Sequence, residues 1–404
     1  MRKILFNGCW MAALVMAPWL SQAQIDPVKR ELLQLGYNAA LQGHSPFSGY
    51  AFLYWNDPDF YRTNFTLRLA VAPTYLDSEF GIRNALGENT DLGIGLAGGG
   101  FADSYSEIRR GRLEQKESFT GYGGELNASI YHLFNPGQMI PLNGVLRGLV
   151  HYSVFDPDNK TDPGFQLPED RGYAGVRAGL RWGGKEPMLF PSLAMELSVW
   201  YEGQFRNEDD IYGYGDRRIE PSTHQFWAQA LLAYTLPKLK HCFFVSLTAG
   251  TSIDADRFSA YRLGALLPLV SEFPLSLPGY YYQEISAREF VLFGGNYLVP
   301  IDEKERWNVN VTATTAAVNY LQGLEQPGHW HSGAGAGVLY KTPSWKVMVG
   351  YAYGVDAIRT SGRGAHSIGF LLQLDWEHAK EVLMDSDGPY RWRGFQNVIN
   401  AIGL

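Results

Sequence analysis

Ser367-Ile368-Gly369-Phe370-Leu371-Leu372-Gln373-Leu374-Asp375-Trp376 alternates with period two and ends on an aromatic residue. One face of such a segment is apolar, and the other carries mainly small or polar side chains. This pattern is typical of a transmembrane β-barrel strand, whose apolar face meets lipid while its other face lines the lumen. We therefore interpret the segment as the closing strand of a barrel. Its lipid face is Ile368, Phe370, Leu372, Leu374 and Trp376, and its lumenal face is Ser367, Gly369, Leu371, Gln373 and Asp375.

Other segments repeat this alternation. Residues 345–353 place Trp345, Val347 and Val349 on one face and Lys346 and Met348 on the other. Residues 193–202 alternate less cleanly and would turn two glutamates inward. Candidate strands recur about every 20 residues, a spacing that fits spans of about 10 residues with turns and loops. The fifteen candidates are 47–56, 64–76, 89–103, 117–134, 140–155, 171–183, 190–205, 222–236, 241–254, 258–268, 287–300, 305–320, 330–342, 345–357 and 364–376.

The expected fold is all-β, a single transmembrane antiparallel up-and-down β-barrel. An up-and-down sheet closes without an edge only when its strand number is even, so one strand is missed or merged. Composition agrees, since 46% of the residues are hydrophobic, 14% are aromatic and 45 are glycine. No later apolar run reaches the roughly 18 residues of a membrane helix, which excludes a helical membrane protein. A secreted water-soluble β-protein is the alternative.

The N-terminus reads as a signal peptide over residues 1–23. Arg2 and Lys3 precede an apolar run, and small residues stand before a cleavage site between Ala23 and Gln24. The mature chain then keeps Cys242 alone, which can form no intramolecular disulfide. The net charge of −7 and the lack of a basic patch exclude a nucleic-acid partner.

The remaining chain is expected to hold one domain. Residues 24–46 form a short periplasmic segment, in which 28–35 is compatible with a short helix, and residues 47–376 form the barrel. Residues 377–404 form a C-terminal extension. Its basic and aromatic stretch 390–395 suits either a membrane interface or a frayed tail.

Several stretches resemble the bacterial surface-antigen barrels, which include BamA-like outer-membrane assembly factors and two-partner secretion transporters. The resemblance covers about the last 120 residues, through the 332–357 hairpin and the closing strand. The stretches that carry it are Arg262-Leu263-Gly264, Glu272-Phe273-Pro274-Leu275, Leu277-Pro278-Gly279-Tyr280-Tyr281-Tyr282-Gln283-Glu284 and Asn296-Tyr297-Leu298-Val299-Pro300-Ile301.

The resemblance implies sixteen strands, with a loop folded into the lumen after the eleventh and five strands beyond it. Five candidates follow Glu284, which places the missed strand before 258. Assembly and secretion members carry periplasmic POTRA domains before the barrel. The short segment ahead of the first candidate has no room for one, so we expect a barrel-only member.

The lumenal-loop motif, Pro278, Gly279, Tyr280 and Glu284, departs from that family. Members place an arginine before the glycine and pair it with an aspartate on a lumen-facing strand. Here Pro278 stands at the arginine position, and 309–316 contains no acid. Losing both partners of a buried ion pair can be nearly neutral. The loop is therefore expected to fold inward and to be held by tyrosine packing and hydrogen bonds, with Gly279 at a tight tip.

Other motifs carry no assigned chemistry. Residues 156–164 group oxygen ligands, but Lys160 interrupts them and a solvated turn is favoured. Residues 208–210 suit either cation bridging to lipid phosphates or an ordinary loop. Residues 43–47 lack the second glycine of a nucleophile elbow, and Arg171-Gly172-Tyr173 reads as a loop-to-strand junction. We assign no catalytic, cofactor-binding or metal-binding residue and expect no enzyme.

The expected role is insertion or translocation of polypeptides or lipids at the bacterial outer membrane. Gly362, Gly364 and Gly369 weaken the lateral pairing of the closing strand, which favours opening there. The partners would be outer-membrane lipids, client membrane proteins and a separate periplasmic partner. The alternatives are a passive diffusion pore, with 258–286 as its constriction loop, and a structural or receptor barrel.

Overall fold

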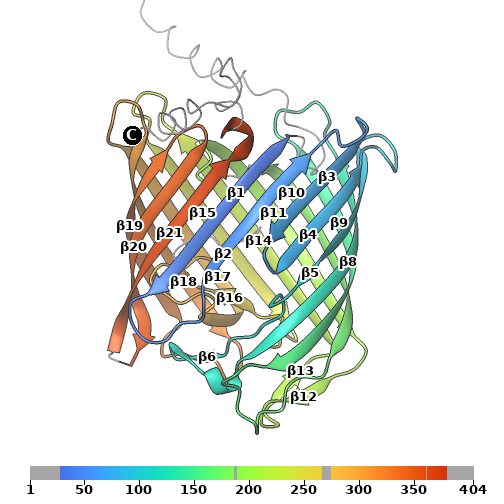
Figure 1. Cartoon of the computed structure of the whole chain (residues 1–404), viewed down its shortest axis with the longest axis vertical. Coiled ribbons are helices and arrows are strands. Elements are labelled where there is room, and N and C mark those ends of the chain that lie inside the picture. The colour runs from blue at the N-terminus through green and yellow to red at the C-terminus, as the bar shows by residue number, and fades with distance from the viewer. Residues whose placement is uncertain (1–27, 186–188, 266–273, 361, 380–404) are drawn as a thin grey trace, which may run out of the picture.

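The protein is a closed antiparallel β-barrel, seen here in a computed structural model that describes residues 28–185, 189–265, 274–360 and 362–379 (Figure 1). Sixteen strands form the wall. They are β1 (Arg30–Ala40), β2 (Gly49–Asp57), β3 (Phe65–Ala72), β4 (Tyr75–Ile82), β5 (Thr90–Gly99), β8 (Phe119–Leu133), β9 (Leu142–Pro157), β10 (Arg171–Gly184), β11 (Leu193–Arg206), β14 (Ser222–Thr235), β15 (Cys242–Ile253), β17 (Ile285–Pro300), β18 (Trp307–Tyr320), β19 (Trp330–Lys341), β20 (Trp345–Arg359) and β21 (Gly362–Asp375).

Short elements occupy the loops. They are β6 (Ile108–Arg109), β7 (Arg112–Leu113), the 3-10 turn η1 (Gln115–Glu117), β12 (Asp210–Tyr212), β13 (Arg217–Ile219) and β16 (Tyr261–Leu263). β6 pairs with β7, β12 pairs with β13, and β16 extends the ladder beside β17. Within the described residues, no helix is long and apolar enough to cross a membrane.

The wall closes between its first and last strands. β1 pairs antiparallel with β21, from Leu32 opposite Asp375 to Ala40 opposite Ser367. We call this ladder the closing seam. The all-β fold and the sixteen strands predicted from the sequence are therefore confirmed.

Three assignments made from the sequence were wrong. The stretch 28–35, read as compatible with a helix in a periplasmic segment, enters β1, so the barrel begins before residue 47. The candidate 64–76 merged β3 with the start of β4, because the turn between them is only Pro73-Thr74. The candidate 258–268 contains only β16, which is too short to cross the wall.

The signal peptide at 1–23, its cleavage site between Ala23 and Gln24, and the stretch 390–395 lie outside the described residues.

Side chains face lipid and lumen as the alternation predicts. In β20, Val349 is 58% exposed and Tyr351 is 46% exposed on the outer face, whereas Met348 and Ala352 are buried on the inner face. In β11, Leu197 and Val199 are likewise exposed, while Glu196 is buried on the lumenal side. The outer surface of the wall is thus an apolar band.

An arginine in this band is expected to impair folding. Val349→Arg places a charge on the lipid face of β20, where it costs up to about 2–4 kcal/mol depending on depth. Thr314→Arg on β18 faces the lumen and keeps access to water, so it is the matched control. The measurement is the folded fraction in lipid vesicles, read from the gel shift between boiled and unboiled samples. Equal losses in both variants would contradict the facing of the wall strands.

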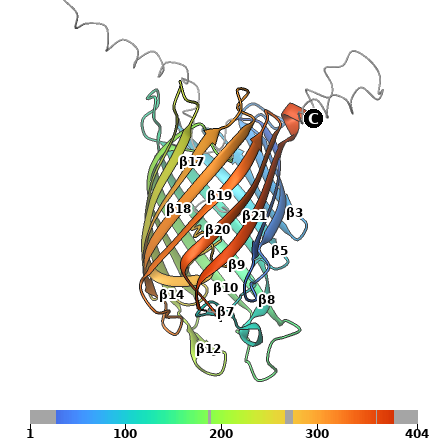
Figure 2. The same cartoon turned by 90° about the vertical axis from the view of Figure 1, so that its left-hand side faces the viewer.

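The two ends of the barrel differ in their connections. Chain segments 100–118, 158–170, 207–221, 254–265 and 274–284 all lie at one end, which we call the long-loop end (Figures 1 and 2). The described terminal residues lie at the other end with the shorter turns, which we call the short-turn end. In outer-membrane barrels long loops face the cell exterior and short turns face the periplasm, which assigns the two sides.

Candidate functional site

The described residues that precede β17, after the eleventh wall strand β15, contact the lumenal side of β19 and β20. We call residues 275–284 the lumenal segment. Leu277, Tyr280 and Tyr281 in it are buried. A Cβ atom at Gly333 of β19 would lie 2.0 Å from the Pro278 carbonyl oxygen, so this backbone approach requires glycine. Gly333 faces the lumen between the exposed outer-face residues of β19, which locates the contact on the inner wall.

Gly279 forms the second close approach. Its φ of +84° is a left-handed conformation, and a Cβ atom there would lie 1.9 Å from the backbone nitrogen of Gly354 in β20. The tight glycine tip predicted from the sequence is present. Whether the whole loop obstructs the lumen stays a prediction.

A buried ion pair fixes the end of the lumenal segment. Arg359, the last residue of β20, donates from Nη1 and Nη2 to the two carboxylate oxygens of Glu284 at 2.8 and 2.9 Å. Its guanidinium also lies over the Tyr281 ring, 3.7 Å from the centroid. The side chains are 2% and 0% exposed, so both charges are removed from water and depend on each other.

The sequence predicted that tyrosine packing and hydrogen bonds hold the loop in place of an ion pair, and this buried pair corrects that expectation. The strand segment 309–316 supplies no acid, as predicted, but the acid lies on the loop and the arginine lies on the wall. Glu284 was named from the motif, whereas Arg359 was missed. The candidate strand 345–357 ended two residues before it.

Hydrogen bonds extend the anchorage to two more wall strands and one turn. His331 of β19 lies between two phenols, with Nδ1 3.2 Å from Tyr280 Oη and Nε2 2.5 Å from Tyr320 Oη. Tyr281 Oη donates to the carbonyl oxygen of Gln42 at 2.8 Å, in the turn between β1 and β2. Burial raises the pKa of Tyr280, so its hydroxyl stays protonated and available for these contacts.

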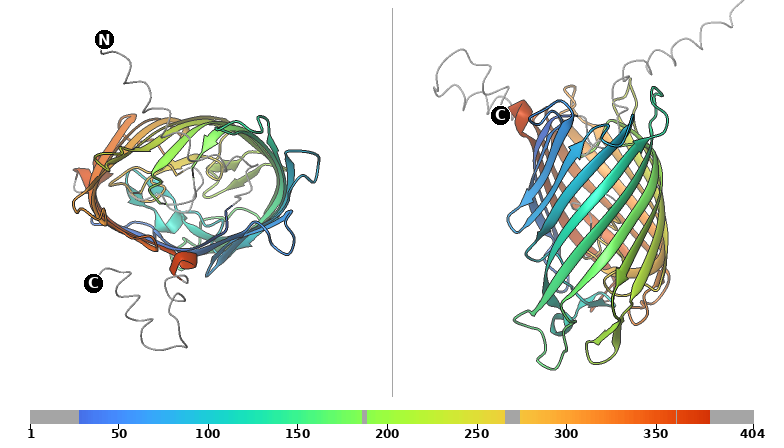
Figure 3. Two further views of the ribbon diagram at one scale, coloured as in Figure 1. Left: turned by 90° about the horizontal axis from the view of Figure 1, so that it is seen from above. Right: turned by 90° about the vertical axis from the view of Figure 1, so that its right-hand side faces the viewer.

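A second element reaches the same place. The β6–β7 hairpin projects inside the outline of the barrel toward β20 (Figure 3). At its tip, a Cβ atom on Gly111 would lie 1.8 Å from the Ile358 carbonyl oxygen. Arg262 binds the two segments together, because it donates to the Ser106 carbonyl at 2.7 Å and the Gln283 carbonyl at 3.1 Å. The hairpin and the lumenal segment therefore form one assembly, which we call the plug.

Ion pairs of a buried carboxylate hold the base of the β6–β7 hairpin. Glu107 is fully buried and accepts hydrogen bonds from Arg257 at 3.1 and 3.3 Å and from Tyr105 at 2.7 Å. Arg217 of β13 lies 3.5 Å from it. Burial opposes ionisation, but Arg257 and Arg217 hold the pKa of Glu107 below its ordinary value. The carboxylate therefore stays charged at neutral pH and links three loops.

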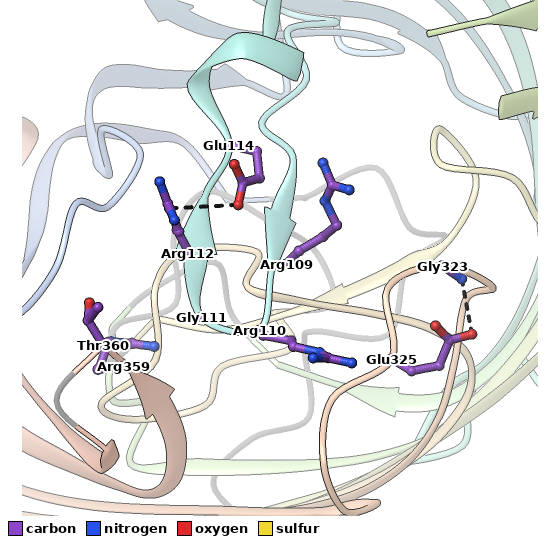
Figure 4. A pocket seen from close by; sticks show the side chains of 9 residues that line it. All are labelled: Arg109, Arg110, Gly111, Arg112, Glu114, Gly323, Glu325, Arg359 and Thr360. Atoms are coloured by element: carbon purple, nitrogen blue, oxygen red, sulfur yellow. Dashed lines mark hydrogen bonds and ion pairs between the residues drawn. The ribbon is translucent and has the colours of Figure 1, made fainter. Parts of the chain in front are cut away.

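An arginine-rich cavity of about 610 Å³ lies beside the plug (Figure 4). In this view the end of β20 and the turn after β18 lie on either side of the hairpin tip, and all three border the cavity. Arg112 on its rim is 79% exposed, 3.8 Å from Glu114, so water screens this pair. The lining residues are Arg109, Arg110, Gly111, Arg112, Glu114, Gly323, Glu325, Arg359 and Thr360.

The short-turn end also has a segment inside the lumen. Leu189, in the connection from β10 to β11, donates its backbone N–H to Gln373 Oε1 at 3.0 Å. Lys346 Nζ donates to the Leu189 carbonyl at 2.6 Å, and Phe190 packs against the lumenal cluster that contains Met348. Gln34 of β1 donates to the same Gln373 oxygen at 3.1 Å. This connection thus reaches across the barrel to the closing seam.

The closing-strand residues lie largely as predicted. Ser367 is fully buried, Gly369 faces inward, and Trp376 is exposed just beyond the strand. Leu372 is half-buried, and Leu374 is buried although it was assigned to lipid. The register neighbours of Leu374 on the outer face are Trp345 and Leu33. The seam is paired over nine positions, and its opening stays a prediction.

The remaining motifs have structural roles. Arg171 opens β10, as predicted, and pairs with Asp210, while Asp209 pairs with Arg218 at 3.0 Å. The 156–164 region holds a turn in which Asp158 N–H donates to Thr161 Oγ1 at 2.8 Å. In the described part of the chain, no group of three or more His, Cys, Asp or Glu residues is arranged to hold a metal ion.

No protein-family model and no curated protein sequence matches the chain. Solved structures do. CdiB from Acinetobacter baumannii aligns with a TM-score of 0.56 at 11% identity over 86% of this chain and 60% of that one. CdiB from Escherichia coli gives 0.56 at 12% over 86% and 63%. BamA from Haemophilus ducreyi lacking POTRA domains 1–3 gives 0.52 at 9% over 85% and 70%.

These comparisons concern the fold. The chain spans less than two thirds of either CdiB chain, and all three identities are low. The resemblance to BamA-like barrels that the sequence suggested is confirmed at the level of the barrel fold.

Proposed function

We propose that this protein inserts or translocates polypeptides or lipids at the outer membrane and is not an open diffusion pore. The observation that carries the proposal is the plug with its buried Glu284–Arg359 pair. A passive pore needs a continuous water path through the lumen. Removing two charges from water beside such a path would cost free energy, and this cost is explained if the pair holds the plug closed. The connection that contains Leu189 lies inside the short-turn end and also favours a closed lumen.

The fold supports the proposal by analogy alone, since one fold hosts many functions. The resemblance of the 262–301 region to surface-antigen barrels implies assembly or secretion of membrane or exported proteins. The partners in this proposal are outer-membrane lipids, client membrane proteins and a periplasmic factor that meets the short-turn end. The proposal includes no catalytic step and no cofactor.

Planar-bilayer recording separates this proposal from the passive pore. The intact barrel is expected to pass only small, irregular current. Replacing 275–283 with a short Gly/Ser linker removes the lumenal segment and is expected to raise the current several-fold. Replacing the turn 158–164 is the matched control and leaves the current low. A large, steady current in the intact protein would establish the pore instead.

A folding assay tests the role itself. Vesicles that contain the purified barrel are mixed with an unfolded eight-stranded outer-membrane barrel, and folded client is measured by its gel shift. The client is expected to fold faster than in protein-free vesicles of the same lipids. Equal rates, together with unchanged lipid exchange between leaflets, would refute the proposed function.

A further inference from the structure

The weakest ladder of the wall is between β2 and β3, away from the closing seam. It has five register pairs, from Leu53 opposite Val71 to Asp57 opposite Leu67. The closing seam has nine pairs, and β8 with β9 has fifteen. At a tilt near 45°, five pairs cover about 12 Å of an apolar band about 25 Å tall, whereas nine pairs cover about 21 Å.

The shortage arises because β3 and β4 are short. Each has eight residues, and their hairpin ends part-way along the wall, while β8, on the far side of β5, continues to the long-loop end (Figures 1 and 3). β2 extends beyond β3 by the four residues Gly49–Phe52. Among the described residues, no strand pairs with this part of β2 on the β3 side.

Antiparallel alternation shows which backbone groups face the empty side. Asn38 N–H donates to the Ser48 carbonyl at 2.8 Å, so these two residues bond across the β1–β2 ladder. Every second residue of β2 then bonds to β1, and the residues between them point their N–H and C=O groups away from it. On the β3 side, the backbones of Gly49 and Ala51 therefore present two N–H donors and two C=O acceptors with the spacing of a β-ladder.

Ion pairs tie β3 and β4 to the strands that follow them. Arg68 of β3 pairs with Asp77 of β4 at 3.3 Å. Glu79 of β4 binds Arg147 of β9 at 2.9 Å and accepts from Tyr131 Oη of β8 at 2.8 Å. The β1–β2 turn is bound instead to the plug through Tyr281. The short β2–β3 ladder thus joins a part of the wall tied to β8 and β9 with a part tied to the plug.

We infer that the Gly49–Phe52 edge of β2 is a docking site for an extended polypeptide strand of a client barrel protein. This inference rests on the proposed function and names its substrate class and entry point. Hydrocarbon satisfies no backbone polar group, and lipid headgroups supply few N–H donors. A strand supplies donors and acceptors at the matching spacing, and its alternating side chains continue the lipid and lumenal faces of the wall.

Photo-crosslinking tests the docking edge. A benzophenone amino acid replaces Ala51, and Ala336, which is also outward-facing but lies in a ladder paired on both sides, is the control. The probe is a synthetic peptide with the sequence of residues 367–376 in vesicles that contain the full chain. Several-fold more adduct at position 51 than at 336 supports the inference. Equal adducts, or crosslinking of position 51 to the chain's own termini, overturn it.

Disulfide staples separate this inference from the proposed function. In a Cys242→Ser background, Leu53→Cys with Val71→Cys closes the β2–β3 ladder, and Leu35→Cys with Leu372→Cys closes the seam. The β2–β3 staple is expected to abolish accelerated client folding, and dithiothreitol should restore it. If only the seam staple blocks folding, the docking edge is wrong and the function stands. If the unstapled barrel never accelerates folding, the function itself fails.

Discussion

Arg359→Ala is expected to release the lumenal segment and raise the bilayer current several-fold. The substitution leaves Glu284 buried without its partner, and breaking a buried pair in this way costs about 3–5 kcal/mol. It also removes the cation from the face of Tyr281. The segment can relieve this cost by moving into water. A cysteine introduced by Tyr280→Cys should then react with an impermeant maleimide added from the long-loop side.

Two controls define the result. Arg112→Ala removes an arginine from the rim of the same cavity, but its pair with Glu114 is solvent-screened and contributes about 0–1 kcal/mol. Its current should match the unchanged protein. Replacing Arg359 and Glu284 together by leucine removes both charges and should restore most of the closure. A low current in Arg359→Ala, with the cysteine at position 280 still unreactive, would show that the ion pair does not hold the plug.

The sequence predicted the wall well because lipid and lumen impose opposite demands on alternate residues. That signal is clear in β20 and β21, where large apolar and small residues alternate from 349 to 355 and from 367 to 370. It is weak in β1, because Leu32 is apolar yet faces inward, and the stretch resembles a helical pattern. In β4 the inward residues are the acids Asp77 and Glu79, whose lumenal partners lie on other strands.

The plug was only partly predictable, since its contacts join residues far apart in the chain. The apolar tyrosines and Gly279 indicated a buried, tightly turned segment, and the structure has both. The Glu284–Arg359 pair forms only because β20 continues five residues past Gly354. Gly111 likewise reaches β20 only because the hairpin projects inward. Alternation along one strand contains no information about such contacts.

Gly279→Ala is expected to displace the lumenal segment from β20. The new Cβ atom would lie 1.9 Å from the Gly354 nitrogen. Its position is fixed by the Gly279 backbone and the nitrogen is itself backbone, so neither atom can rotate aside. The φ of +84° adds a strain of about 1–2 kcal/mol for any residue other than glycine. The bilayer current should rise, and so should maleimide labelling in the Tyr280→Cys background.

Gly328→Ala separates the contact from the strain. Gly328 has a nearly equal φ of +89°, but no atom lies within 4 Å of the position that its Cβ would occupy. Both variants therefore incur the same conformational cost, and only Gly279→Ala meets the wall. If the two give equal currents, the effect comes from backbone strain, and the close approach to Gly354 does not close the barrel. If only Gly279→Ala conducts, the glycine-to-glycine contact is what keeps the segment against the inner wall.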